Sequence, residues 1–162
     1  MLFRSAQTYN NYNENYYSET QDNKLSEIIA SDNWDYVSIQ QVSGYSGISS
    51  SYSNIYNFVN KIKTYLVDEE HTKFAFHMTW AYQSDSNHQD FAKYHNNQDE
   101  MYNAILGCVQ DLDRDVFDII IPNGTTVQNA RTSYLGDNIT RDGFHLNEYY
   151  GRYMASDRKS VV

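Results

Sequence analysis

The chain has 162 residues and a formal net charge of −9 at pH 7. This length suits a single ordinary domain with its own core. A nucleic-acid binder needs a basic face to displace counterions from phosphates, and an anionic membrane repels an acidic chain, so we expect neither partner. A single cysteine excludes an internal disulfide, and no apolar run approaches the ~20 residues of a membrane span.

The first half of the chain begins with a polar segment and then alternates helix and strand. Residues 6–23 are rich in Asn and Tyr without a hydrophobic period, so we expect a loop or weak helix there. Residues 23–31 predict a short helix, and the β-rich run 34–40 predicts a strand. A Ser/Gly-rich loop follows at 41–53, and apolar residues at helical spacing predict a second helix over 53–68.

The second half repeats the alternation. Residues 73–82 predict a second strand, and a long helix is expected over 88–113. The apolar run 116–122 predicts a third strand, which its closing proline stops. A helix is expected to begin within 124–134, and the last helix over 146–156.

Strands that alternate with helices indicate a parallel sheet with helices on both faces, and hence an α/β fold. The uninterrupted run Ile119–Ile121 suits a strand that is covered on both faces. Ligands bind such sheets at the carboxyl ends of the strands. The segments after the strands, QQVSGYSG, TWAYQSDSNH and PNGTT, are all polar, and RDGFH is expected to join them. Their convergence predicts a functional site at this edge.

Asp142 and His145 stand three residues apart in the stretch RDGFHLN. The spacing suits an acid–base pair in which a carboxylate orients an imidazole, and such a pair serves a nucleophile. The alternative is an aspartate at the entry of a helix beside a surface histidine. The spacing alone does not choose between these interpretations.

Four segments together carry a family resemblance: WDYVSIQQVSGYSG (34–47), HMTWAYQ (77–83), DIIIPNGTTVQNAR (118–131) and RDGFHLNEYYGRYMAS (141–156). They resemble the SGNH-hydrolase superfamily of GDSL-like esterases, and within it a bacterial subgroup catalogued only as a domain of unknown function. The resemblance covers roughly residues 25–156. It implies a flavodoxin-like, three-layer α/β/α fold with a parallel sheet.

The resemblance also implies roles for individual residues. His145 would be the catalytic base, and Asp142 would orient it. The Gly-Asn-Ser-Phe-Ser block, which carries the nucleophilic serine after the first strand in this subgroup, does not occur here. We therefore expect a partial domain without the first strand and the nucleophile. The wider superfamily has an Asn oxyanion donor after the strand equivalent to 35–40, where this chain offers Gln41 or Ser43.

Other candidates are less specific. Trp80 either packs in the structure or forms a wall of a substrate site, and Arg141 pairs with a carboxylate or with the substrate. The loop serines are not expected to replace the nucleophile, since no strand-to-helix elbow motif surrounds them. His88 and His95 lack a third ligand at metal spacing, so we expect no metal, and we expect no cofactor.

Both ends of the chain look foreign to the protein. LFRS can be encoded by CTCTTCCGATCT and DRKSVV by GATCGGAAGAGCGTCGTG, and these share one core on opposite strands. That core resembles a short-read sequencing adapter. We therefore interpret residues 1–162 as one partial domain in which residues 2–5 and 157–162 are adapter-derived.

We expect a fragment of a serine esterase that removes acetyl or other small acyl groups from carbohydrates, with the fragment itself inactive. The sixteen tyrosines could stack on sugar rings, although several lie in the biased stretch YNNYNENYY. One alternative is a non-catalytic carbohydrate-binding relative that uses the same cleft. Another is an FMN-binding flavodoxin-like module. A nucleophile block or a phosphate-binding loop in sequence before this chain would discriminate among the three.

Overall fold

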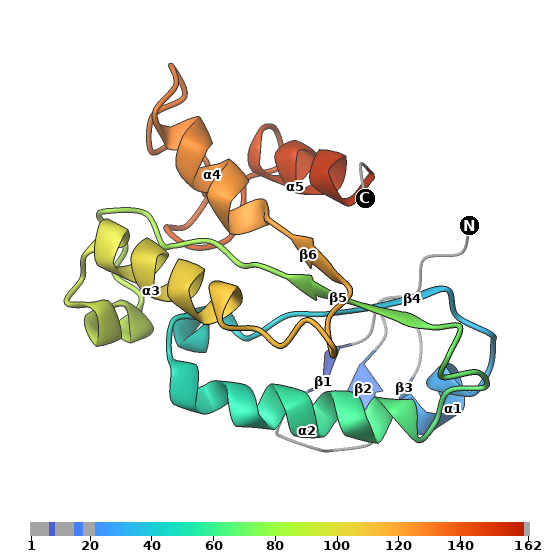
Figure 1. The fold of residues 1–162 in the computed structure, drawn as a ribbon. Helices are drawn as coiled ribbons and strands as arrows, with labels where there is room; N and C mark the ends of the chain where they lie inside the picture. The colour runs from blue at the N-terminus through green and yellow to red at the C-terminus, as the bar shows by residue number, and fades with distance from the viewer. Residues whose placement is uncertain (1–6, 9–14, 18–21, 161–162) are drawn as a thin grey trace. The chain divides into compact units, whose positions relative to one another are not determined.

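The computed structural model describes residues 7–8, 15–17 and 22–160 (Figure 1). The chain divides into two compact units: Met1–Val37 with Ser53–Lys73, and Ser38–Tyr52 with Phe74–Val162. Among the described residues, no helix has the length and apolar character needed to cross a membrane.

The first unit begins with a small antiparallel sheet of β1 (Gln7–Thr8), β2 (Asn15–Tyr17) and β3 (Asp22–Lys24). The predicted loop or weak helix is wrong for these residues, and the rest of 6–23 lies outside the described residues. The three strands pair through backbone groups that stand several residues apart along the chain. A local hydrophobic pattern does not report such pairing.

Both helices predicted for the first unit are confirmed. Helix α1 (Leu25–Ile29) buries its two terminal residues. Helix α2 (Tyr52–Lys63) buries Ile55, Val59 and Ile62, which recur at the spacing of one helical face. It ends five residues earlier than the predicted boundary at residue 68.

Strands β4 (Tyr36–Ile39), β5 (Lys73–His77) and β6 (Ile119–Ile121) form a second sheet in the order β4-β5-β6. β5 and β6 pair in parallel, with Phe76 opposite Ile120. Phe76 is buried and meets the ring of Phe117 edge-on at 5.3 Å. These strands lie where the sequence predicted them, with shorter bounds.

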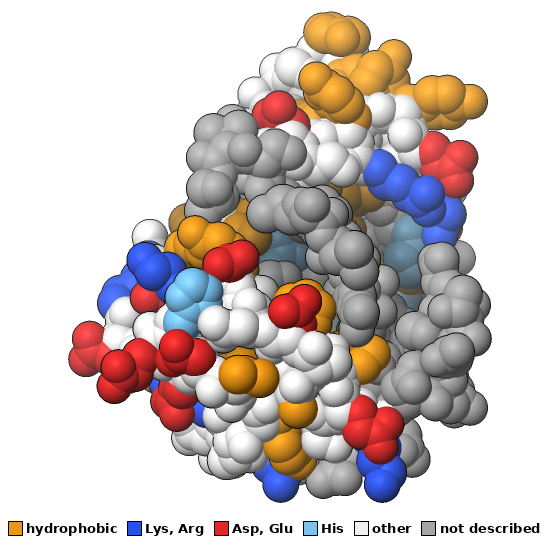
Figure 2. Space-filling model, turned by 90° about the vertical axis from the view of Figure 1, so that its right-hand side faces the viewer, with side chains coloured by type: hydrophobic (Ala, Val, Ile, Leu, Met, Phe, Trp, Pro, Cys, Tyr) orange, Lys and Arg blue, Asp and Glu red, His pale blue; other side chains and the backbone are white. Residues whose placement is uncertain are grey.

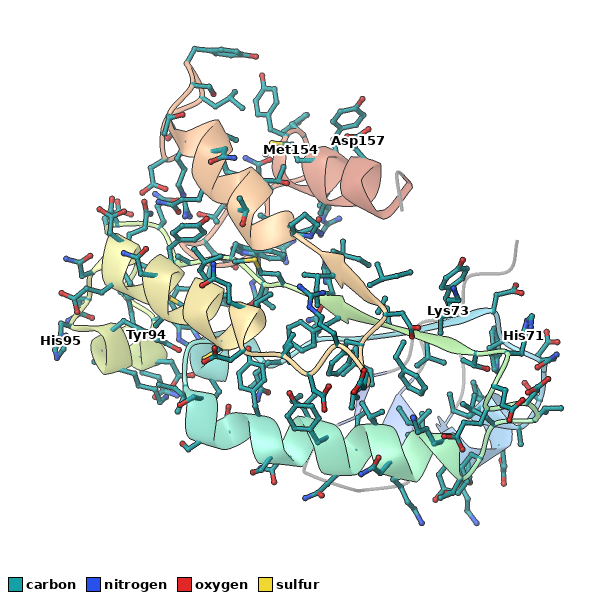
Figure 3. All side chains as sticks on the ribbon, in the orientation of Figure 1. His71, Lys73, Tyr94, His95, Met154 and Asp157 are labelled. Carbon is teal, nitrogen blue, oxygen red and sulfur yellow. The ribbon has the colours of Figure 1, made fainter. Side chains whose placement is uncertain are left out.

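The long helix predicted over 88–113 is wrong as a single element. The chain forms a 3-10 helix η3 (Gln89–Tyr94) and a separate helix α3 (Gln98–Gln110). His95, labelled beside Tyr94 in Figure 3, has a φ of +54°, which ends η3. The Asn97 side chain then accepts the backbone N–H groups of Asp99 and Glu100 and caps α3. An Asn cap stabilises a new helix start more than it stabilises a continuing helix.

The C-terminal region consists of α4 (Asn123–Arg131) and α5 (Gly151–Ser160), which lie side by side in Figure 1. Val127 of α4 is buried, and Met154 of α5 packs against the same cluster. The last helix begins five residues later than predicted, since the Asn147 side chain accepts the N–H of Gly151 at its start. Residues 157–160 belong to α5, whereas 2–5 and 161–162 lie outside the described residues, so the expectation of adapter-derived ends stays a prediction.

Candidate catalytic site

Asp142 and His145 lie in a tight loop of the second unit. Thr140 and Leu146 face each other across the base of this loop in an isolated antiparallel bridge. Gly143 turns the chain between the pair with a φ of +89°, a conformation that favours glycine. The loop therefore brings the carboxylate of Asp142 into contact with the imidazole of His145, three residues later in the chain.

The carboxylate of Asp142 fixes both the backbone and the ring of His145. Its Oδ1 accepts the backbone N–H groups of Phe144 at 3.2 Å and His145 at 2.7 Å. Its Oδ2 lies 2.6 Å from Nδ1 of His145. A carboxylate only accepts, so Nδ1 carries the shared proton and Nε2 is left as the basic nitrogen.

The second ring nitrogen of His145, Nε2, is not engaged by the pair. The His145 side chain is 55% exposed, and in residues 24–157 no side chain hydrogen-bonds its Nε2. This arrangement suits a general base that accepts a proton from a hydroxyl group. The carboxylate orients the ring through one nitrogen, and the other nitrogen has no partner among the described side chains.

The pKa of the Asp142 carboxyl group is low. Desolvation raises it, but the hydrogen bonds from the His145 ring and from the N–H groups of His145 and Phe144 outweigh that effect and lower the pKa to about 2. The folded pKa is then below the ordinary value of ~3.9. The contribution of Asp142 to stability is therefore present above pH ~4 and is lost as the pH falls toward 2.

We expect a carbon-detected NMR titration of the Asp142 carboxyl group to show a midpoint near 2. In His145→Ala the midpoint should rise toward ~3.9 without reaching it, because the two backbone hydrogen bonds remain. A wild-type midpoint near 4 would contradict the bond between the two side chains.

Aromatic side chains pack against the loop that carries Asp142 and His145. The Trp80 indole N–H donates to the Phe144 carbonyl at 2.7 Å. The Phe144 ring lies 4.2 Å from the His145 ring, 4.6 Å from the His88 ring and 5.8 Å from the Tyr82 ring, centre to centre. The imidazole of His145 is thus supported on one face by Phe144. Phe144 was not singled out from the sequence, and neither Tyr82 nor His88 was linked there to the pair, because only packing connects these rings to it.

The two oxyanion candidates differ in their surroundings. The Gln41 amide donates to Ser51 Oγ at 2.9 Å, and its oxygen accepts the N–H of Val42, so it is bound within its own loop. Ser43 Oγ lies 3.0 Å from the hydroxyl of buried Tyr82. Since the Tyr82 ring contacts Phe144, Ser43 is linked to the loop of the pair and Gln41 is not.

The remaining two candidates, Trp80 and Arg141, both contact the loop that carries the pair. Trp80 holds the Phe144 carbonyl and also packs against the core cluster of α4 that contains Val127. Arg141 is exposed, and its Nε lies 3.8 Å from Asp142 Oδ2. Its guanidinium group therefore lies beside the carboxylate without displacing the imidazole.

A buried ion pair supports the neighbouring loop and was not foreseen from the sequence. The Arg131 side chain is 5% exposed, and its Nε lies 2.7 Å from Asp137 Oδ1 in an ion pair whose N–H is not aligned for a hydrogen bond. Its Nη2 donates to the Ala81 carbonyl at 2.9 Å. Asp137 also accepts the Ser84 N–H at 2.8 Å and the Gln98 amide. This network connects α4, α3 and the segment that follows β5.

Burial affects the two charged groups of this network in opposite ways. Desolvation lowers the pKa of Arg131 even though Asp137 acts to raise it. Desolvation would raise the pKa of Asp137, but the hydrogen bonds from Ser84, the charge of Arg131 and the bond from Gln98 together hold it below its usual value. Both groups are therefore charged at neutral pH, and each depends on the other.

Two polar loops that the sequence predicted to converge do lie together. The Gln83 N–H donates to the Gly143 carbonyl at 2.8 Å, and Thr140 Oγ1 donates to Gln83 Oε1. Residues from the segments 83–87 and 138–143 line an open surface hollow of about 330 Å³, which we call the polar hollow. Its lining residues are Gln83, Asp85, Ser86, Asn87, Asn138, Thr140, Arg141, Asp142 and Gly143.

A side chain at Gly143 would be crowded by Ser86. A Cβ at this position would lie 3.2 Å from Ser86 Cα, and the φ of +89° adds strain. We expect Gly143→Ala to lower the free energy of unfolding by about 2–3 kcal/mol, measured by urea denaturation. Gly136→Ala is the matched control, since Gly136 also has a positive φ (+57°) but a Cβ there would meet only Asn138 Nδ2, at an ordinary 3.7 Å, and should cost about 1 kcal/mol. Equal losses would show that the contact with Ser86 contributes nothing.

His88 and His95, which the sequence analysis considered as metal ligands, each contact an acidic residue. His88 Nδ1 accepts the N–H of Asp90, and His95 Nδ1 lies 2.6 Å from Glu100 Oε2. In the described part of the chain, no group of three or more His, Cys, Asp or Glu side chains is placed to hold a metal ion.

Several tyrosines are exposed around the last helix. Figure 2 shows hydrophobic side chains gathered at the top of the view, at the level of α4 and α5 in Figure 1. The exposed tyrosines of this region are Tyr134, Tyr149, Tyr150 and Tyr153. The stretch YNNYNENYY has no described side chains, so the expected sugar-stacking role of its tyrosines lies outside the described residues.

The sequence profile described as "Domain of unknown function (DUF4886)" matches residues 7–158. A crystal structure of a DUF4886 family protein from Bacteroides uniformis is 39% identical, with a TM-score of 0.76. The match covers 86% of this chain and 55% of that protein, so the chain spans about half the length of its solved relative. No curated protein matches the sequence.

Two more distant solved structures share the fold. A candidate SGNH hydrolase from Slackia heliotrinireducens has a TM-score of 0.61 at 16% identity, over 84% of this chain and 70% of that one. A candidate GDSL-like lipase from Parabacteroides merdae has a TM-score of 0.50 at 13% identity, over 78% and 59%. The α/β fold with a parallel sheet and the resemblance to SGNH hydrolases are thereby confirmed.

Proposed function

This chain belongs to the DUF4886 family, and from that premise we propose that the whole protein is a serine ester hydrolase of the SGNH type. The observation that carries the proposal is the geometry of Asp142 and His145. The carboxylate holds Nδ1 at 2.6 Å, and the His145 side chain is 55% exposed, with no described side chain bonded to Nε2. A hydrolase-like fold supports the proposal, but fold alone does not establish a reaction.

In the proposed reaction, His145 Nε2 takes the proton of a serine hydroxyl while the serine oxygen bonds to the ester carbonyl carbon. Collapse of the tetrahedral intermediate breaks the ester bond, and the leaving alkoxide takes the proton from Nε2. Water then repeats the two steps on the acyl-serine and releases the carboxylic acid. Asp142 keeps the imidazole in the required tautomer and stabilises its cationic form.

We propose that the nucleophilic serine lies outside these 162 residues. In the described region no serine hydroxyl bonds Nε2 of His145, and the chain spans only 55% of its solved relative. For the side-chain oxyanion donor we favour Ser43, which is linked through Tyr82 to the loop of the pair. Gln41 would first have to release Ser51.

We further propose that the substrates are carbohydrates that carry O-acyl groups, and that acetyl is the preferred acyl group. The polar hollow supports this choice, because hydrogen-bonding side chains line it beside Asp142. The second candidate function is a non-catalytic carbohydrate-binding protein that uses the same surface. The same observation favours it, and it differs only in lacking a serine opposite His145.

The test uses the gene extended upstream of this chain. We expect the extended protein to hydrolyse p-nitrophenyl acetate and to react with a fluorophosphonate, which labels activated serines. Mass spectrometry should locate the label on a serine outside residues 1–162, and the 162-residue chain alone should stay unlabelled. A label on Ser43 would contradict the proposed position of the nucleophile, and neither label nor hydrolysis would favour the binding protein.

A further inference from the structure

The polar hollow has an unusual lining for a small-molecule site. Its volume of about 330 Å³ lies at the small end of ligand pockets, which range over roughly 300–1,000 Å³ and are mostly apolar. Here every lining residue except Gly143 carries a side chain that is able to form hydrogen bonds. Such a lining suits one compact ligand that presents hydroxyl groups on several sides.

Several of these side chains have hydrogen-bonding capacity that the protein does not use. The Asn87 amide has no hydrogen bond with any described residue. The Asn138 amide nitrogen donates to the Leu135 carbonyl at 3.0 Å, which leaves its oxygen available. The Arg141 guanidinium group only approaches Asp142, at 3.8 Å. The polar hollow thus offers both donors and acceptors, as adjacent hydroxyl groups require.

The walls of the polar hollow are held in place by other contacts. Gln83 is bound through its N–H to Gly143 and through its side chain to Thr140. The N–H of Ser84 donates to Asp137, the carboxylate that pairs with buried Arg131. A wall fixed in this way loses little freedom when a ligand binds.

The charges of the lining favour a neutral ligand. Asp85 and Asp142 contribute two carboxylates, and Arg141 contributes one cation. The excess of one negative charge disfavours uronates and phosphorylated groups. Asp142 also belongs to the pair with His145, so a ligand in the polar hollow lies beside the loop that carries the base.

We propose that the polar hollow binds a neutral monosaccharide ring, which is the alcohol part of the ester. The assignment of that ring to a substrate rests on the proposed function, whereas the binding itself does not. The sugar would occupy the polar hollow while its acyl group extends toward His145.

The test is a ¹⁵N NMR titration of the full chain with methyl glycosides of glucose, xylose and N-acetylglucosamine. We expect saturable shifts of the side-chain amides of Gln83, Asn87 and Asn138 with one or more of them, and a Kd in the millimolar range. Asn87→Leu should weaken that binding at least tenfold. Asn129→Leu is the matched control, because Asn129 is exposed on α4 outside the polar hollow, and should leave the Kd unchanged.

Three results would overturn this proposal: no saturable shift with any of the glycosides, equal weakening by both leucine variants, or tighter binding of glucuronate than of glucose. Binding is measured without turnover, so it is separable from the reaction. Sugar binding without hydrolysis by the extended protein would sink the proposed function alone. Hydrolysis of an acetylated sugar with a KM that Asn87→Leu does not change would sink the assignment of the polar hollow alone.

Discussion

Replacing His145 with alanine is expected to lower kcat/KM of the extended protein on p-nitrophenyl acetate by about 10³-fold or more. The physical reason is that the serine hydroxyl loses its proton acceptor and the leaving alkoxide loses its donor. His145 is 55% exposed, so the fold should tolerate the change. The loss should appear mainly in kcat, since Nε2 acts on the reacting atoms and not on the resting substrate.

The chain offers a matched control for this variant. His71 Nε2 lies 2.9 Å from Asp35 Oδ1, which makes a second exposed His–Asp pair (Figure 3 labels His71 near the start of β5). His71→Ala removes an equivalent interaction in the first unit and should leave kcat/KM within about twofold. Retention of most activity by His145→Ala, with a normal melting curve, would defeat the role proposed for His145.

Asp137→Asn is expected to destabilise the fold by about 2–3 kcal/mol, because it leaves the guanidinium group of Arg131 uncompensated. Arg131 is 5% exposed, so water cannot replace the lost carboxylate. The Asp137 side chain is 28% exposed. We therefore expect a smaller loss of stability than for an ion pair in which both partners are fully buried. Urea denaturation followed by circular dichroism would measure the change.

Two further variants show whether the pair or the single charge matters. Replacing both partners, Arg131→Met with Asp137→Leu, should recover most of the loss, since no buried charge then remains. Glu69→Gln breaks the exposed ion pair with Lys63 and should change stability by less than about 0.5 kcal/mol. If Asp137→Asn unfolded at the same urea concentration as the wild type, the carboxylate would not be needed to compensate the charge of Arg131.

The network of Asp137 also connects stability to the candidate site. Asp137 accepts the N–H of Ser84, which lies in the chain between two residues that line the polar hollow, Gln83 and Asp85. The Thr140–Gln83 and Gly143–Gln83 bonds then join this segment to the loop that carries Asp142. A variant that weakens the ion pair should therefore also loosen the polar hollow, whereas Glu69→Gln should not.

The sequence alone determined the features that depend on neighbouring residues. The strands at 36–39, 73–77 and 119–121 were predictable because they are short runs rich in β-branched and aromatic residues. The relation of Asp142 to His145 was also predictable, since a span of three residues leaves few possible geometries. The turn at Gly143 is enough to bring Asp142 Oδ2 within 2.6 Å of His145 Nδ1.

The tertiary structure alone decided the features that join distant segments. Arg131 meets Asp137 and the Ala81 carbonyl after β5, and Asp137 in turn accepts the Gln98 amide, through contacts that no local pattern encodes. The break at His95 depends on the competition between a continuing helix and the cap at Asn97, which the hydrophobic period does not reveal. The polar hollow joins residues 83–87 to 138–143. Hydrophobic periodicity specifies which elements form, but the packing of those elements decides which of their loops meet.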